Sequence, residues 1–273
     1  MDIQNVRVIY FSPTGATARV ADTIAGELAL HLDVPAEQQS FTRPRERENT
    51  YAFQPQDLVV VAVPTYAGKL PNKILPDLQG KLKGNGALAV PVVTFGNRSY
   101  DNSLAELCAV LEACGFHTMA AGAFVCRHAF TDELAYGRPG WSDQFEMKNF
   151  AKQIAQKVRS MTEVPAPIKV PGDASAPYYV PKGTDGEPAK FLKAKPKTNL
   201  TRCNGCGACV KNCPMGAIDP KNVSNVPGTC IKCQACVRRC TKRAKYFDDP
   251  AFLSHVSMLE QNFSEPKENE MFL

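Results

Sequence analysis

Eight cysteines fall in two short segments, and both segments show the spacing C-x₂-C-x₂-C-x₃-C. The first reads CNGCGACVKNCP from residue 203 and the second reads CIKCQACVRRC from residue 230, so each cysteine recurs 27 residues on. Thiolates suit zinc or iron–sulfur clusters. Structural zinc sites usually bring two Cys-x-x-Cys pairs separated by a longer finger, whereas here three cysteines at spacing two surround one compact object. The spacing therefore favours an iron–sulfur cluster, with zinc as the alternative.

The first segment, with Pro214 after its fourth cysteine, is the signature of bacterial two-cluster ferredoxins. Residues 198–248 resemble such a [4Fe–4S] ferredoxin, in which each fourth cysteine crosses to the other cluster. The second segment departs from the pattern at Thr241, where the proline is missing. The resemblance implies that cluster I takes Cys203, Cys206, Cys209 and Cys240, and that cluster II takes Cys230, Cys233, Cys236 and Cys213.

A second group of residues could bind phosphate. The stretch SPTGATA, residues 12–18, follows a predicted strand and opens a predicted helix. Hydroxyl groups around a glycine at a helix N-terminus favour an anion, because backbone N–H groups and the helix dipole point at it. The stretch contains no Lys or Arg and matches neither GxxxxGK[ST] nor GxGxxG. An ordinary capped helix start is the alternative.

This stretch resembles the flavodoxin phosphate loop, [ST]-x-T-G-x-T, with Ala16 where many members have asparagine. Two more loops, PTYAGKLP from residue 64 and TFGNRSYDN from residue 94, follow later strands. The resemblance implies an FMN site in which Tyr66 stacks on the flavin ring and Asp101 meets the ribityl chain or supports its loop. The FMN-site residues implied in this way are Ser12, Thr14, Gly15, Ala16, Thr17, Pro64, Thr65, Tyr66, Ala67, Gly68, Thr94, Phe95, Gly96, Asn97, Arg98, Tyr100 and Asp101.

The elements that position these loops alternate between strand and helix. Strands are predicted at residues 5–11, 37–41, 57–64, 87–95 and 117–126, and helices at residues 17–32, 104–115 and 143–161. The third and fourth strands are continuous apolar runs, which is typical of strands covered on both faces. Five alternating strands predict an α/β, flavodoxin-like, doubly wound parallel sheet, followed by a small α+β ferredoxin-like domain.

The chain divides by composition into four stretches. We expect an FMN-binding domain at residues 1–163, a Pro/Lys-rich linker at 164–197, a ferredoxin-like domain at 198–250 and a tail at 251–273. The linker lacks any helical or alternating period, and Tyr178, Tyr179 and Phe191 are its predicted anchors. The tail begins as an amphipathic helix that can dock on either domain.

As a whole the chain resembles the flavodoxin–ferredoxin fusion proteins of anaerobes. The stretch HAFTDELAYGRPGWSD, residues 128–143, supports this resemblance, which implies that His128 and the turn 137–139 reach the flavin edge. A hydrogen-bonded structural histidine is the alternative. Cys108, Cys114 and Cys126 lack ligand spacing, and we expect them to be packing residues.

Composition limits where the chain works and what it binds. With 273 residues, eleven cysteines and no apolar run long enough to span a membrane, it is expected in the reducing cytoplasm. Two clusters and one phosphate change the formal net charge from +5 to about −1. The basic residues of the cysteine segments then compensate buried negative charge or dock an acidic partner. Nucleic-acid binding is disfavoured, because no aromatic residues interleave with them.

The sequence favours an electron carrier that moves electrons between the clusters, FMN and a redox partner protein. The alternative is an enzyme, a ferredoxin-fed flavin reductase of a quinone or another small acceptor, with residues 127–143 roofing its pocket. A metal-stapled interaction module is a third option. Transfer within one chain and transfer between the chains of a homodimer are both open.

Overall fold

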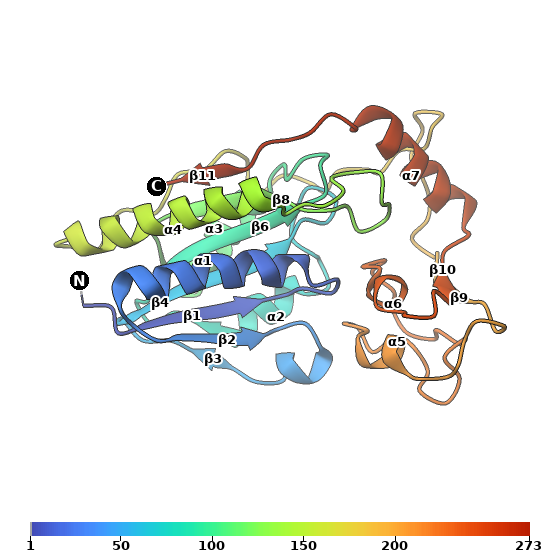
Figure 1. The fold of residues 1–273 in the computed structure, drawn as a ribbon, viewed down its shortest axis with the longest axis horizontal. Coiled ribbons are helices and arrows are strands. Elements are labelled where there is room, and N and C mark those ends of the chain that lie inside the picture. Colours follow the sequence, from blue (N-terminus) through green and yellow to red (C-terminus); the bar gives the residue numbers. More distant parts are fainter. Residues whose placement is uncertain (1) are drawn as a thin grey trace.

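The structure, a computed structural model, describes residues 2–273 and has a parallel sheet at its centre (Figure 1). Its five main strands are β1 (Asn5–Tyr10), β2 (Ala36–Ser40), β4 (Asp57–Pro64), β6 (Leu88–Phe95) and β8 (Ala121–Val125). They run parallel in the order β2-β1-β4-β6-β8. Counted along the main strands this order is 2-1-3-4-5, the order of flavodoxin-like folds. The predicted fold class is confirmed.

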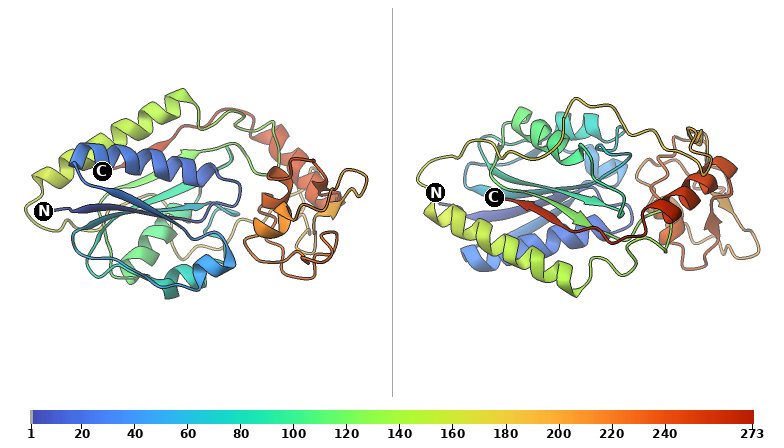
Figure 2. Two further views of the ribbon diagram at one scale, coloured as in Figure 1. Left: turned by 60° about the horizontal axis from the view of Figure 1, so that its bottom comes forward. Right: turned by 90° about the horizontal axis from the view of Figure 1, so that it is seen from above.

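The helices cover both faces of the sheet, because its central strands are apolar on both sides. Along β4, Val59, Val61 and Val63 belong to one core, and Leu58, Val60 and Ala62 to the other. The first core is closed by α2 (Leu75–Lys81) and α3 (Ser103–Ala113), the second by α1 (Ala16–Leu32) and α4 (Trp141–Ser160). Figure 2 shows the sheet between these two layers.

The fifth strand differs from the prediction, because it is interrupted. A short strand β7 (His117–Thr118) and β8 both pair with β6. Thr118 lies opposite Ala89, whereas Gly122 lies opposite Val92, so the outer strand holds one residue more than β6 over this interval. An extra residue of this kind is a β-bulge. Three smaller elements lie between β2 and β6: η1 (Pro44–Arg47), β3 (Tyr51–Ala52) and β5 (Leu82–Lys83).

The cysteine segments form two copies of one small motif. They contain the short helices α5 (Ala208–Lys211) and α6 (Ala235–Arg238), bracketed by the paired strands β9 (Lys197–Thr198) and β10 (Lys245–Tyr246). Each helix follows a residue in the left-handed region, Gly207 at φ 70° and Gln234 at φ 62°. The sequence repeat is therefore a backbone repeat. Its apolar core is small and includes the Cys236 side chain.

The linker crosses the sheet domain in an extended conformation, and its predicted anchors make contacts. The Tyr178 hydroxyl donates to the Leu70 carbonyl over 2.7 Å. The backbone N–H of Tyr179 donates to the Ala67 carbonyl over 2.9 Å. The Phe191 ring stacks on His255 with the ring centroids 5.3 Å apart.

The tail starts as the predicted helix and then returns to the sheet. Met258 and Leu259 of α7 (Pro250–Asn262) pack on Leu134. Beyond this helix, β11 (Glu270–Phe272) adds antiparallel to the edge strand β8 (Figure 1). The sequence analysis did not predict this strand. None of the helices found within residues 2–273 combines the length and the apolar character that a membrane span requires.

Candidate cofactor site

A cavity of about 510 Å³ opens at the carboxyl ends of the parallel strands. It is lined by the loops that follow β1, β4 and β6, which are the loops where flavodoxin-like sheets bind ligands. Its volume falls within the usual range for small-molecule sites. The sequence-predicted residues that line it are Thr14, Ala16, Thr17, Pro64, Thr65, Tyr66, Ala67, Gly68, Thr94, Phe95, Gly96 and Arg98.

The first loop is held by its own hydroxyl groups. Ser12 Oγ accepts a hydrogen bond from the Ala18 N–H over 3.0 Å, and the Thr17 and Thr94 hydroxyls are 2.8 Å apart. Gly15 adopts φ 98° as the N-cap of α1. Ser12 and Gly15 therefore shape the loop rather than line the cavity, where the early N–H groups of α1 are available to an anion.

The second loop turns tightly between Tyr66 and Lys69, which exchange backbone hydrogen bonds of 2.8 and 3.1 Å. Gly68 adopts φ 76°, and a Cβ there would lie 2.2 Å from Asp101 Oδ2. Only glycine fits this position. Asp101 also pairs with Arg98, so it supports the loop and is not among the lining residues.

Two predicted residues of the third loop serve the tail instead of the cavity. The Asn97 amide donates to the carbonyls of Phe263 and Glu265 over 2.6 and 2.9 Å. The Tyr100 hydroxyl donates to Glu270 over 2.7 Å. Neither Asn97 nor Tyr100 lines the cavity. The loop sequence is the same whether its polar groups face a flavin or a returning strand, so the sequence alone did not separate these roles.

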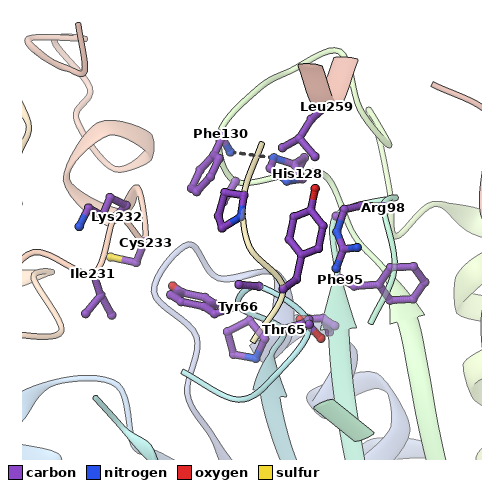
Figure 3. Close-up of a pocket in the computed structure, with 18 of the residues that line it drawn as sticks. Thr65, Tyr66, Phe95, Arg98, His128, Phe130, Ile231, Lys232, Cys233 and Leu259 are labelled. Carbon is purple, nitrogen blue, oxygen red and sulfur yellow. Dashed lines mark hydrogen bonds between the residues drawn. The ribbon is translucent and has the colours of Figure 1, made fainter. Parts of the chain in front are cut away.

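Segments distant in sequence complete the cavity. They come from the end of β8, the linker, the second cysteine segment and α7 (Figure 3). The lining residues that the sequence analysis did not place in this site include Asn72, Ser99, Tyr178, Tyr179, Pro181, Phe191, Leu192, Ile231, Lys232, Cys233, His255 and Leu259. Arg127, Ala129 and Phe130 belong to the stretch 127–143 that the sequence analysis expected as the roof of a reductase pocket. The expected packing residue Cys126 is buried and also lines the cavity.

His128 lies in the cavity wall as a neutral imidazole. Its Nδ1 accepts a hydrogen bond from the Phe130 N–H over 3.1 Å (Figure 3). Burial, together with the nearby positive charges of His255, Arg238 and Arg98, lowers the pKa of His128 to about 4. The imidazole of His128 therefore stays uncharged at neutral pH, with one ring nitrogen used by the backbone.

The turn 137–139 lies outside the cavity wall. Arg138 donates through Nε to both Asp143 carboxylate oxygens at 3.1 Å, and the turn contributes no lining residue. Burial raises the pKa of Asp143, but hydrogen bonds from Arg138, Gly140 and Asn269 outweigh burial and leave that pKa below its ordinary value. This turn holds the start of α4 and the tail, and it does not line the cavity.

Tyr66 connects the cavity with the second cysteine segment. Its ring lies in the cavity wall with the hydroxyl end toward the segment that carries Cys233 (Figure 3). Burial raises the pKa of Tyr66 well above its ordinary value, and negative charge on Cys233 and Cys230 raises it further. One side of this ring therefore faces the cavity, and its hydroxyl faces the thiols.

The thiols of the second segment gather with a cysteine of the first. Burial raises the pKa of Cys233, and negative charge on Cys236, Cys213 and Cys230 raises it further. Burial likewise raises the pKa of Cys236 to about 12. Cys213 thus lies near the three cysteines of the other segment. Sulfur donors gathered in this way suit iron.

Backbone N–H groups support the fourth cysteine of each segment. Ala217 N–H donates to Cys213 Sγ over 3.2 Å, and Ala244 N–H donates to Cys240 Sγ over 3.3 Å. Burial raises the pKa of Cys240, but hydrogen bonds from the backbone of residues 242–245 outweigh it and lower the pKa. Donors of this kind stabilise thiolates, the form that binds iron. Within residues 2–273, no three His, Cys, Asp or Glu side chains converge as ligands of a single metal ion.

Three arginines hold the cysteine segments against the carboxyl edge of the sheet. Arg47, on η1, donates to the Pro214 carbonyl over 2.6 Å. Arg238 donates to the Ala129 carbonyl over 3.0 Å, and Arg239 donates to the Pro13 carbonyl over 2.9 Å. The cysteine segments therefore lie beside the cavity and beside the first loop.

Comparison with known proteins identifies the cysteine-rich part. The family described as the 4Fe-4S dicluster domain matches residues 194–245. No curated protein matches the chain.

Among solved structures, a flavodoxin from the domain Archaea is 16% identical, covers 57% of this chain and 99% of its own, and has a TM-score of 0.41. An NADH:FMN oxidoreductase in its apo form is 17% identical, covering 59% of this chain and 91% of its own at a TM-score of 0.41. Rubredoxin oxygen:oxidoreductase from Desulfovibrio gigas is 15% identical, covering 58% of this chain and 37% of its own at a TM-score of 0.38. The strand order, together with the matched domain, shows a flavodoxin-like fold joined to a 4Fe–4S domain.

Proposed function

We propose that this chain is an electron-transfer protein in which FMN occupies the 510 Å³ cavity and two [4Fe–4S] clusters occupy the cysteine segments. In this proposal residues 1–163 hold FMN, residues 198–250 hold the clusters, and residues 164–197 and 251–273 connect the two parts. FMN exchanges one or two electrons, and a [4Fe–4S] cluster passes one at a time.

A single observation carries the proposal: Cys233 lines the same cavity as Tyr66 and the phosphate loop. A proposed ligand of cluster II therefore contributes directly to the wall of the proposed flavin site. Cys213, Cys230, Cys233 and Cys236 are assigned to cluster II, and Cys203, Cys206, Cys209 and Cys240 to cluster I.

The residues of the site have distinct tasks in this proposal. Thr14, Ala16 and Thr17 bind the phosphate at the start of α1, where N–H groups and the helix dipole favour an anion. Tyr66 packs on the ring, and Tyr179 and Phe191 of the linker exclude water from above. Arg98 lies over the Tyr179 ring at 4.1 Å and fixes that side of the enclosure.

The other end of the cysteine part faces solvent. Cys206 is exposed, whereas Cys236 is buried. Leu200 and Tyr246 of the same part are apolar side chains exposed to solvent. Lys211 and Lys242, also in this part, are exposed too. We assign this side to a redox partner protein with acidic groups, so that cluster I serves the partner and cluster II serves the flavin.

Anaerobic stopped-flow mixing tests the carrier. Protein with chemically reduced clusters is mixed with FMN, and flavin absorbance is followed. We expect FMN to be reduced at the expense of the clusters. Clusters that stay reduced beside oxidised, bound FMN refute the carrier. Iron, acid-labile sulfide and flavin are quantified in the same material, and zinc in place of iron refutes the cluster assignment.

A second function is supported by the lining residues His128, Phe130 and His255, which lie outside the three strand-end loops. They form a neutral, aromatic part of the cavity that suits a flat acceptor such as a quinone. Its reduction takes two electrons, delivered singly through the clusters, and two protons from solvent. Partner-free turnover of a quinone with a chemical reductant favours this reductase over the carrier.

A further inference from the structure

The first loop lacks a cation of its own, although it is the proposed site of a phosphate. SPTGATA contains neither Lys nor Arg. Hydroxyl and N–H donors bind a phosphate without balancing its charge, which is nearly −2 at neutral pH. The cavity reaches this loop through Thr14, Ala16 and Thr17.

Arg239 of the second cysteine segment lies over this loop. Its Nε donates to the Pro13 carbonyl over 2.9 Å. Its Nη2 lies 3.5 Å from the position that a Cβ on Gly15 would occupy. One edge of the guanidinium is thus fixed by the backbone, and the other lies against the glycine at the N-terminus of α1.

The charge of Arg239 is not balanced by a carboxylate. Of the ion pairs formed within residues 2–273, none includes Arg239. Its neighbour Arg238 points to a different loop, where it pairs with Asp132 and donates to the carbonyls of His128 and Thr131. Two adjacent arginines therefore contact two different loops, and only Arg239 keeps a charge free for an anion.

We propose that Arg239 supplies the missing cation and binds the phosphate of the flavin across the boundary between the two parts of the chain. This inference rests on the proposed FMN site and adds to it the residue by which the site distinguishes FMN from riboflavin. Because the contact joins both parts, flavin binding and docking of the cysteine segments must strengthen each other.

The test is flavin selectivity, measured as dissociation constants by fluorescence titration of full-length, cluster-loaded, flavin-depleted protein. FMN and riboflavin share the ring and differ in the phosphate, so their affinity ratio isolates the phosphate contact. In Arg239→Gln we expect FMN affinity to fall about tenfold, as for one lost charge-assisted hydrogen bond, with riboflavin affinity nearly unchanged. Arg239→Lys keeps the charge but loses the planar guanidinium, so its FMN affinity should lie between those of wild type and Arg239→Gln.

Arg238→Gln is the matched control, because it removes the same charge from the neighbouring residue. If Arg238→Gln loosens the docking of the cysteine segments, the affinities for FMN and for riboflavin should fall by the same factor, and the FMN-to-riboflavin affinity ratio should stay unchanged. Raising the salt concentration should shrink the difference between wild type and Arg239→Gln, since Arg239 is exposed.

A second readout follows the docking itself. FMN should protect the linker from limited proteolysis more than riboflavin does, and Arg239→Gln should abolish that difference. An unchanged FMN-to-riboflavin ratio in Arg239→Gln overturns the role of Arg239 while leaving the FMN site intact. Wild-type protein that binds neither flavin overturns the proposed function, and this inference with it.

Discussion

The buried guanidinium of Arg47 donates to the carbonyl of Pro214, the residue after Cys213, over 2.6 Å. Arg47 also donates to the Thr42 carbonyl over 2.5 Å and pairs with Asp77 at 2.7 Å. One side chain thus joins the sheet domain to the backbone beside a proposed cluster II ligand.

We predict that Arg47→Met lowers the stability of the cluster-loaded protein by about 2 kcal/mol, because two buried carbonyls lose their donor. For a chain of this size the thermal midpoint should fall by about 5 °C. Arg45→Met is the control, since Arg45 is exposed on the same short helix. Equal midpoints for the two variants would contradict the role of Arg47.

Crossed ligation predicts the effect of removing Cys213. Cys213→Ala should lose about half of the iron and acid-labile sulfide, because one of two clusters loses a ligand. Its cysteine segments should also become sensitive to proteases. Cys108→Ala is the control, since Cys108 is buried in the core cluster and has no proposed iron. Full iron content in Cys213→Ala sinks the crossed assignment.

Gly96 touches His128 closely. A methyl group on Gly96 would lie 2.3 Å from His128 Cδ2 and 3.0 Å from its Cα. Gly96→Ala should therefore displace the histidine loop, costing about 1–3 kcal/mol of stability and weakening flavin binding. Gly26→Ala is the control: Gly26 lies within α1 with nothing within 4 Å, so this change should stabilise by about 0.5–1 kcal/mol.

The buried His128 predicts a dependence on pH. Its pKa is lowered to about 4, below the value of about 6.5 in the unfolded chain. Its neutral form therefore contributes stability that is complete above about pH 6.5 and is lost progressively as the pH falls toward 4. The thermal midpoint of wild type should drop between about pH 7 and pH 5, and the drop should be smaller in His128→Asn, whose carbonyl still accepts from Phe130. His31→Asn, at a partly exposed histidine, is the comparison. If the thermal midpoint of His128→Asn falls with pH as much as that of wild type, His128 is not the source of the pH dependence.

Asn97 anchors the tail, and it gives the fifth prediction. Asn97→Asp keeps the acceptor for the Lys267 N–H but turns a carboxylate oxygen toward the carbonyls of Phe263 and Glu265. We expect about 2 kcal/mol of local destabilisation. Hydrogen exchange at β11 measures it. Asn222→Asp is the control, because within residues 2–273 the Asn222 side chain makes a single hydrogen bond, accepted from the Ser224 N–H, and a carboxylate retains it. Slow exchange at β11 in Asn97→Asp would show that the tail is held in another way.

The sequence predicted the parallel sheet because that signal is local. The apolar runs at β4 and β6 and the periodicity of α1 and α4 depend on residues a few positions apart, and the structure has these elements close to the predicted limits. The bulge near Met119 and the strand β11 were missed. A three-residue edge strand carries no periodicity, and its pairing with β8 depends on contacts more than a hundred residues away.

The site shows the same division. Loops that follow strands are local features, so Thr14, Thr65 and Gly96 were found. The contributions of Phe191, Cys233 and His255 to the cavity wall were not predicted. These residues come from separate segments, and no short sequence pattern encodes how those segments dock. The contacts of Asn97 and Tyr100 with the tail could not be predicted for the same reason: their donors face a segment that returns from the other end of the molecule.

The strand β11 has a consequence for synthesis on the ribosome. Residues 270–272 are translated after both cysteine segments, yet they pair with the edge of a sheet whose other strands are translated before them. Domains begin to fold as they emerge, so the edge of β8 stays unpaired while the cysteine segments are being synthesised. The last strand of the sheet can therefore pair only after the cysteine segments have been synthesised, so completion of the sheet domain depends on the far end of the chain.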